Sequence, residues 1–425
     1  MVDGALDFSF LALLVLDWTE FALRWLHVVT AIAWIGSSFY FIALDLGLRR
    51  HENLPDLVHG EEWQVHGGGF YHIQKYLVAP KALPEHLTWF KWESYATWLS
   101  GFALMAVVYY IGADLYLIDT EKADLPLWGA IGLSLAVLGL GWVGYNALCH
   151  SKLGDNPTAL MLALYVILVI LAYGLDQIFT GRAAFLHLGA VTATIMSFNV
   201  LMVIIPNQRI VVADLKAGRV PDAKYGKIAK LRSTHNNYLT LPVIFFMLSN
   251  HYPLAHSTEY SWIIASLVFL MGVSIRHYFN SNHARKGSPR WTWGVTLALF
   301  LTIMALSLAP LFSHQSDEEL ALSELSLTDQ QMKLASSPHF EDVRDVVLGR
   351  CSMCHAKEPF YDGVRWPPKG VMLETDSQIL TQAHVIVTQS GLSHAMPPAN
   401  VSYMEDEERQ LLLRWYKASF GDQKS

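Results

Sequence analysis

Apolar runs about 20 residues long recur along most of this chain, and they constrain its fold more than any other feature. A bilayer core of about 30 Å requires about 20 apolar residues per helix. Lipid cannot satisfy the open backbone of an irregular segment, so each run is read as a helix. The sequence therefore predicts an all-α fold whose polytopic bundle has eight transmembrane helices, at 21–47, 94–118, 125–148, 158–179, 183–205, 238–255, 258–280 and 290–312.

The sixth span is the most polar of the eight. It contains Asn250, His251 and Pro253. Without it the number of spans would be odd, and the C-terminus would lie on the other side of the membrane.

Basic residues are distributed very unevenly between the two sides of the predicted bundle. The loops at 49–93, 149–157, 206–237 and 276–290 hold 17 Lys and Arg, whereas the opposite side has only Arg24, Lys122 and Arg182. The positive-inside rule places the basic loops in the cytoplasm. With eight spans, the N-terminus and the C-terminal domain then lie in the periplasm of a bacterial inner membrane.

The C-terminal quarter differs in composition from the rest. The chain has 30 Lys and Arg against 37 Asp and Glu, and the net charge of −7 falls after residue 316. No basic surface for nucleic acid is present. We predict a membrane domain at 1–316, an acidic linker at 317–334 and a helical domain at 335–425, with helices near 339–350 and 404–418. Ser402 and Glu405 are spaced as a capping box for the last helix.

The strongest chemical motif is the CxxCH sequence at 351–355. Two cysteines three residues apart can form thioethers to the vinyl groups of a haem, and the following histidine then faces the iron. Cys351 and Cys354 are the predicted attachment residues of a c-type haem, and His355 is the predicted axial ligand. The alternatives are a chance match and a zinc or redox CxxC. The remaining cysteine, Cys149, lies at the end of a span, so no disulfide is expected in the exported domain.

A second axial ligand is expected downstream of the motif. Met396 is our candidate, because Pro397 and Pro398 follow it in a rigid loop and because Met/His ligation is typical of class I cytochromes c. The rival ligands are Met372, Met404, His384 and His394.

Ionisable residues inside the spans mark candidate sites in the membrane domain. His27, His187, His251 and Arg24 fall toward the outer ends of their helices. Paired imidazoles would hold a b-type haem, and a single one would act as a general base. The third interpretation is structural, with the histidines bonded to water or to nearby carbonyl groups.

Several stretches together resemble one known family. HVVTAIAWIGSSFYF at 27–41, HGGGFYHIQKY at 66–76, TWFKWESYATWLSG at 88–101 and the terminal CSMCH domain are similar to the bacterial integral-membrane urate oxidases fused to cytochrome c. The resemblance implies oxidation of urate to 5-hydroxyisourate in purine breakdown. It also implies that electrons leave through the covalent haem to a respiratory cytochrome oxidase, and that dioxygen is not the direct oxidant.

The catalytic residues stay open at this point, with His27, Arg24, His187 and His251 as candidates. Arg24 and His27 would supply a cationic clamp and a base. The first span also resembles small membrane proteins that bind b-haem through a first-helix histidine, which favours His27 as a ligand. Two other functions remain: a quinol or other small-molecule dehydrogenase that reduces cytochrome c, and a membrane-anchored electron carrier without enzymatic activity.

Overall fold

The computed structural model describes residues 8–76, 83–119, 122–309, 327–362, 364 and 367–419. Contacts divide the chain into two compact units. We call residues 20–312 the membrane unit, and residues 1–19 with 313–425 the C-terminal unit. Most of the predicted linker, residues 317–326, lies outside the described residues.

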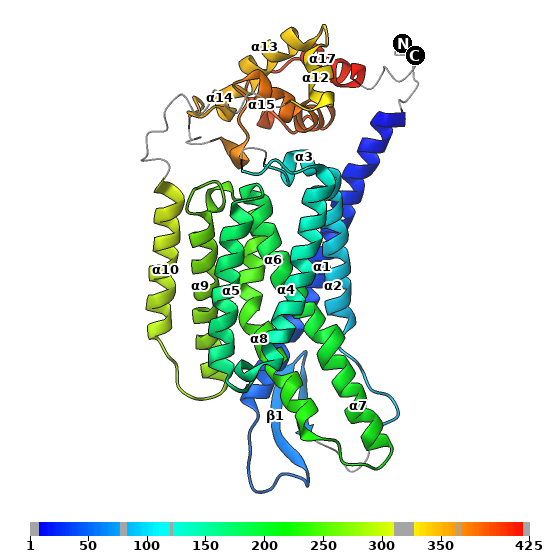
Figure 1. The fold of residues 1–425 in the computed structure, drawn as a ribbon, viewed down its shortest axis with the longest axis vertical. Coiled ribbons are helices and arrows are strands. Elements are labelled where there is room, and N and C mark those ends of the chain that lie inside the picture. Colours follow the sequence, from blue (N-terminus) through cyan, green and yellow to red (C-terminus); the bar gives the residue numbers. More distant parts are fainter. Residues whose placement is uncertain are drawn as a thin grey trace. The chain divides into compact units, whose positions relative to one another are not determined.

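Long helices build most of the membrane unit, as Figure 1 shows. Two π-helical segments continue long helices: η1 (Ala106–Ile111) joins α2 to α3, and η3 (Asn199–Ile204) joins α6 to α7. Residues 20–47 of α1 belong to this unit. The helices are α1 (Phe8–Gly47), α2 (Trp92–Met105), α3 (Ala113–Tyr116), α4 (Leu127–His150), α5 (Pro157–Asp176), α6 (Gly181–Phe198), α7 (Ile205–Lys216), α8 (Ala223–Ser249), α9 (Ser261–His283) and α10 (Trp291–Leu308).

Among the described residues, seven helices are long and apolar enough to cross a membrane, which confirms seven of the eight predicted spans. The remaining span, 238–255, is not among these seven helices. Its first part lies in α8, which begins at Ala223, has a polar N-terminal half and ends at Ser249, so the predicted end at 255 is wrong: Pro253–Ala255 form the separate short helix η4. Arg232 in that half bonds Asn146 near the end of α4, whereas Asn250, just beyond α8, bonds Arg182 at the start of α6. Helix α8 therefore runs the length of the bundle.

One loop departs from the all-α prediction. Residues 58–76 form an antiparallel hairpin of β1 (Val58–His66) and β2 (Gly69–Tyr76). Gly67 and Gly68 between the strands have φ of 60° and 80°, a conformation that glycine adopts without strain. Trp63 and His72 stack across the strands with ring centroids 4.2 Å apart. The glycine run is thus a hairpin turn, which the helical pattern of apolar residues did not predict.

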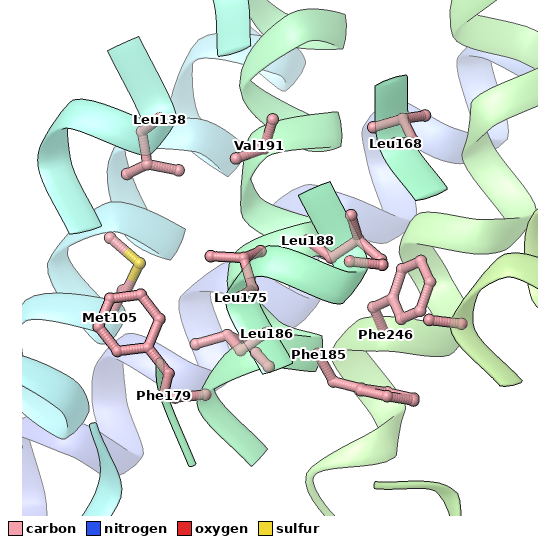
Figure 2. Packing of buried hydrophobic residues seen from close by; sticks show 14 of the residues in the cluster. Met105, Leu138, Leu168, Leu175, Phe179, Phe185, Leu186, Leu188, Val191 and Phe246 are labelled. Carbon is pink, nitrogen blue, oxygen red and sulfur yellow. The ribbon is translucent and has the colours of Figure 1, made fainter. Parts of the chain in front are cut away.

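The core of the membrane unit is a continuous set of apolar side chains between α2, α4, α5, α6, α8 and α9. Figure 2 shows Phe185 on α6 close to Phe246 on α8, and their ring centroids are 5.6 Å apart. Where α8 and α9 meet, a Cβ on Gly272 would lie 2.5 Å from Pro242 Cδ, so only glycine fits there. The helices therefore pack closely enough to fix side chains that face the interior.

The C-terminal unit is helical around a small core of its own. Its helices are α12 (Asp329–Ala335), α13 (Phe340–Arg350), α14 (Ser352–His355), α15 (Asp376–Thr381), α16 (Ala383–Ile386) and α17 (Asp406–Ala418), with turns η6 (Pro368–Gly370), η7 (Val387–Leu392) and η8 (Pro398–Asn400). Leu412, Trp415 and Tyr416 share one face of α17 and are buried. Phe340 of α13 stacks on Trp415 with centroids 6.0 Å apart.

Both predicted helices of this unit form, as α13 and α17, but the predicted capping box is wrong. Glu405 is the N-cap of α17, and its partner three residues on is Glu408. Ser402 lies before the helix, and its hydroxyl is buried with no partner in the described part of the chain. Acidic side chains accept backbone N–H bonds as serine does, so an acidic run can shift a cap by one turn.

Candidate functional site

A cavity of about 210 Å³ in the C-terminal unit brings the predicted haem residues together. Cys351, Cys354, His355 and Met396 all line it, although 41 residues separate the last two in the sequence. The other lining side chains are mainly apolar, among them Val371, Leu373, Val385, Ile386 and Val401.

Local structure positions the CxxCH motif at the end of a helix. Cys351 is the C-cap of α13, where its N–H donates to Val347 O, and the next turn is α14. The side chain of Cys351 is buried, and burial raises the pKa of its thiol to about 12. The thiol of Cys354 is more exposed, and burial raises its pKa as well. Both cysteines are free thiols.

His355 is held in one tautomer. Its Nδ1 lies 2.9 Å from Val371 O, and because a carbonyl oxygen only accepts, Nδ1 carries the proton. This leaves Nε2 with a lone pair. Metal-bound histidines are usually oriented by such a bond from the other ring nitrogen.

Met396, which also lines the cavity, is held by its backbone. Its N–H donates to Gln389 O over 3.0 Å, and its carbonyl oxygen accepts from Arg409 Nη1 over 2.9 Å. The rival ligands named above, Met372, Met404, His384 and His394, are absent from the described lining. Met404 belongs to the apolar core.

These residues fit a c-type haem. Two free thiols three residues apart, an imidazole with a fixed tautomer and a thioether face one apolar cavity, which is the donor set that such a haem requires. Cys351 and Cys354 would hold the haem covalently, and His355 and Met396 would bind its iron.

A second cavity, in the membrane unit, also measures about 210 Å³. We call it the membrane cavity. Along α6 its lining runs from Arg182 to Ser197, a helical rise of about 22 Å. Its walls are mainly apolar, and its polar lining includes Arg24, His27, Thr97, Arg182, Asn250 and His251.

His27 projects from α1 toward α2. Its Nδ1 lies 3.0 Å from Thr97 O and therefore donates, so Nε2 again has a free lone pair. The ring fits against the backbone of α2 because residue 101 is glycine. A Cβ there would lie 2.7 Å from His27 Cε1.

Two guanidinium groups line the same cavity. Arg24 pairs with Glu20 one helical turn earlier on α1. Arg182 Nε donates to Asn250 Oδ1 over 3.3 Å, and its guanidinium lies 4.5 Å from the Tyr116 ring centroid.

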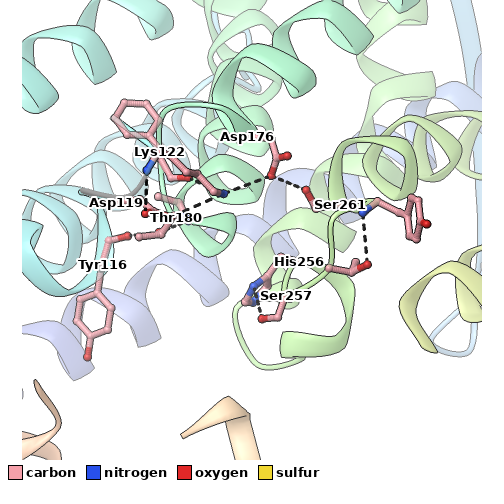
Figure 3. Close-up of polar contacts among 12 residues, drawn as sticks. Tyr116, Asp119, Lys122, Asp176, Thr180, His256, Ser257 and Ser261 are labelled. Carbon is pink, nitrogen blue, oxygen red and sulfur yellow. Dashed lines mark hydrogen bonds and ion pairs between the residues drawn. The ribbon is translucent and has the colours of Figure 1, made fainter. Parts of the chain in front are cut away.

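The start of α6, which carries Arg182, is fixed by a network of polar contacts. Thr180 caps the helix by accepting from Ala183 N–H, and its own hydroxyl donates to Tyr116 O over 2.7 Å. Figure 3 shows the adjoining contacts, in which Asp176 accepts from Ser261 over 2.5 Å and lies 3.8 Å from Lys122 Nζ. The network joins α5, α6 and α9 at this end of the bundle.

The four candidate catalytic residues separate into two groups. Arg24, His27 and His251 line the membrane cavity, whereas His187 does not. His187 is fully buried, with Nδ1 bonded to Ala183 O and Nε2 bonded to Ser134 Oγ. The sequence did not predict that Arg182, Asn250 and Tyr109 line this cavity. They come together only through the packing of α6, η1 and the end of α8.

Comparison with known proteins gives one match. The family model described as Urate oxidase N-terminal matches residues 13–307, more than half of the chain. No curated protein and no solved structure matches. Several apolar helices together with this match indicate a multi-pass membrane protein with a urate-related oxidoreductase function.

Proposed function

This chain belongs to the urate oxidase N-terminal family, and we propose on that premise that it oxidises urate to 5-hydroxyisourate and delivers the electrons to a respiratory cytochrome oxidase. The family match supports the urate part of the proposal. The observation that carries the electron-transfer part is the convergence of Cys351, Cys354, His355 and Met396 on one cavity. Multi-pass helices and the excess of basic residues in one set of loops support a bacterial inner membrane with a periplasmic C-terminal unit.

The reaction balances without dioxygen. Urate and one water molecule give 5-hydroxyisourate, two electrons and two protons, as the water oxygen forms a bond to the bridging carbon C5. The protein must therefore bind a planar anion, accept protons near it and remove electrons one at a time. Hydrogen-bond donors placed where charge develops stabilise such a reaction most.

The C-terminal unit would serve the removal of electrons. A covalent c-type haem bound there supplies a one-electron carrier whose potential is raised by Met/His ligation. The chain's own contribution is positional: Val371 orients His355, and Arg409 fixes the backbone of Met396.

The membrane cavity suits a b-type haem. Its volume equals that of the C-terminal cavity, and both are lined mainly by apolar side chains. His27 would bind such a haem through Nε2, and Arg182 and Arg24, the latter also paired with Glu20, would offer cations to its carboxylates. A b-type haem bound there supplies a second one-electron carrier inside the bundle.

An anaerobic spectrum of the purified protein tests the proposal. Adding urate should produce the reduced c-type spectrum in the wild type, and Cys351→Ser should abolish the covalent haem. If urate leaves the haem oxidised where dithionite reduces it, the proposal is wrong. Reduction by a quinol alone would instead support the quinol dehydrogenase, and reduction only by a protein donor would support the electron carrier.

Extraction with acid acetone tests the second haem separately. It should release a non-covalent haem from the wild type and none from His27→Ala, while the covalent haem remains on both chains. Absence of extractable haem from the wild type would remove the b-type haem from the proposal and leave the c-type haem unaffected.

A further inference from the structure

A buried cation lies in α8, outside both cavities. Arg232 is only 2% exposed, although it falls in a stretch that reads as a basic cytoplasmic loop. Five further buried or half-buried polar residues surround it from α4, η3 and α8. We call the group the Arg232 cluster: Arg232, His235, Asn236, Asn199, Asn146 and Tyr145.

Every hydrogen bond recorded for the guanidinium goes to a neutral amide. Nη1 donates to Asn199 Oδ1 over 3.1 Å, and Nη2 donates to Asn146 Oδ1 over 2.7 Å. The side-chain nitrogen of Asn199 donates in turn to Asn236 Oδ1 over 2.9 Å and to the Tyr145 hydroxyl over 3.2 Å. These bonds fix the amides around the cation but do not neutralise it.

No carboxylate of the described residues lies within 4.0 Å of Arg232. The same holds for Arg276 on α9, which is 6% exposed and donates to Asn237 and Asn280. Removing a guanidinium from water without a counter-charge costs several kcal/mol. A guanidinium that is buried without a carboxylate favours an anion beside it.

The cluster also has an unused polar atom and an aromatic wall. His235 is 1% exposed, and its Nδ1 bonds the Tyr145 hydroxyl over 2.8 Å. Its Nε2 is buried without a hydrogen-bond partner among the residues that the structure describes. The Arg232 guanidinium lies 4.9 Å from the ring centroid of Tyr145 and 5.9 Å from that of Trp142. Amide groups, an imidazole and flat rings match a planar anion whose edge alternates N–H and C=O groups.

We propose that the Arg232 cluster recognises the urate anion. The assignment rests on the proposed function and names the binding site of its substrate. Asn199 follows Ser197, which lines the membrane cavity, by two positions in the chain, although none of the six cluster residues belongs to the described lining of that cavity. Eighteen residues of helix separate Arg232 from Asn250 at the other end, a rise of about 27 Å. Urate would thus be bound in the half of the bundle next to the basic loops.

The test is urate-dependent reduction of the covalent haem in the full-length holoprotein, measured anaerobically by stopped flow. Arg232→Gln should raise KM for urate roughly 10- to 100-fold, the factor expected when a charge-assisted hydrogen bond is lost. Reduction by dithionite and the spectra of the bound haem should stay as in the wild type. Arg219→Gln is the matched control, because it removes a positive charge from the same basic segment at a side chain that is 65% exposed.

Tyr145→Phe keeps the test decisive if Arg232→Gln does not accumulate. It removes only the hydroxyl that joins Asn199 to His235, and it should raise KM for urate severalfold. A wild-type KM in both Tyr145→Phe and Arg232→Gln, or in Tyr145→Phe alone if Arg232→Gln does not fold, would overturn the assignment. The proposed function fails separately, if the wild type is not reduced by urate at all.

Discussion

The contact between His27 and Gly101 allows the membrane cavity to be perturbed without substituting any of its polar residues. In Gly101→Ala the new methyl would lie 2.7 Å from His27 Cε1 and 3.0 Å from Nδ1. The imidazole would have to move roughly 0.7 Å to regain ordinary contact, a displacement that overpacked cores accommodate at a cost of about 1–3 kcal/mol. The bond from Nδ1 to Thr97 O would be weakened by about 1 kcal/mol as well.

A compensating gain must be subtracted from that cost. Alanine is favoured over glycine in a helix interior by about 1 kcal/mol. The net loss of stability is therefore about 1–3 kcal/mol, small enough for the bundle to fold. The ring itself, however, no longer presents Nε2 at the same place. We expect Gly101→Ala to lower the amount of extractable haem per chain and to shift its absorption spectrum.

Gly36→Ala is the matched control, since Gly36 is on the same helix as His27 and a Cβ there would meet nothing within 4 Å. It should keep the haem content of the wild type and gain up to about 1 kcal/mol in stability. Extractable haem per chain and thermal unfolding are measured on both variants. If Gly101→Ala retains the full haem content with an unchanged spectrum, the argument that His27 is held against α2 as a ligand is wrong.

Two further predictions concern the C-terminal unit. Burial raises the pKa of Cys351 to about 12, so in haem-free protein at pH 8 this thiol should be alkylated about 1,000-fold more slowly than an ordinary thiol, with a rate that rises about tenfold per pH unit. Mass spectrometry measures the two alkylation rates, and Cys354 should react first. Equal rates at the two cysteines would contradict the prediction. Arg409→Met should cost about 1–3 kcal/mol and weaken Met396 ligation, because Arg409 donates to Ser390 O, Met396 O and Asn400 Oδ1. A lower reduction potential and a weaker far-red Met–iron band are expected. Arg344→Met, at a half-buried position, is the control, and an unchanged band in Arg409→Met would refute the role.

Sequence patterns predicted the helices better than the sites. Seven spans could be read from the apolar runs because a bilayer imposes their length and composition directly. The hairpin at 58–76 escaped that reading, since its strands carry charged and polar residues on both faces and only the glycine turn at Gly67 and Gly68 marks it.

The candidate sites divide in the same way. The spacing of Cys351, Cys354 and His355 is local, so the sequence alone predicts that they act together. The prolines after Met396 led to its prediction as a fourth member, and all four residues line one cavity. The membrane cavity is formed by side chains from α1, α2, α6 and the end of α8, and no local pattern brings Arg24 and Arg182 together. His187 illustrates the opposite error: a histidine in a span looks functional in the sequence, yet both of its ring nitrogens have partners.

Arg232 and Arg276 show most clearly what a charge count cannot reveal. Both were counted among the basic residues of the cytoplasmic side, and setting them aside still leaves that side in large excess, so the predicted orientation does not depend on them. Their burial does need an explanation. Asp176 is paired with Lys122 and bonded by Ser261. Arg409, like Arg232, has no carboxylate within 4.0 Å among the described residues, but its bonds to two carbonyl oxygens and an amide stabilise a loop. Arg232 stabilises no loop and has no counter-ion within 4.0 Å among the described residues, while an adjacent imidazole nitrogen is buried without a partner. A bound anion therefore explains the presence of this charge in the apolar interior better than a contribution to folding does.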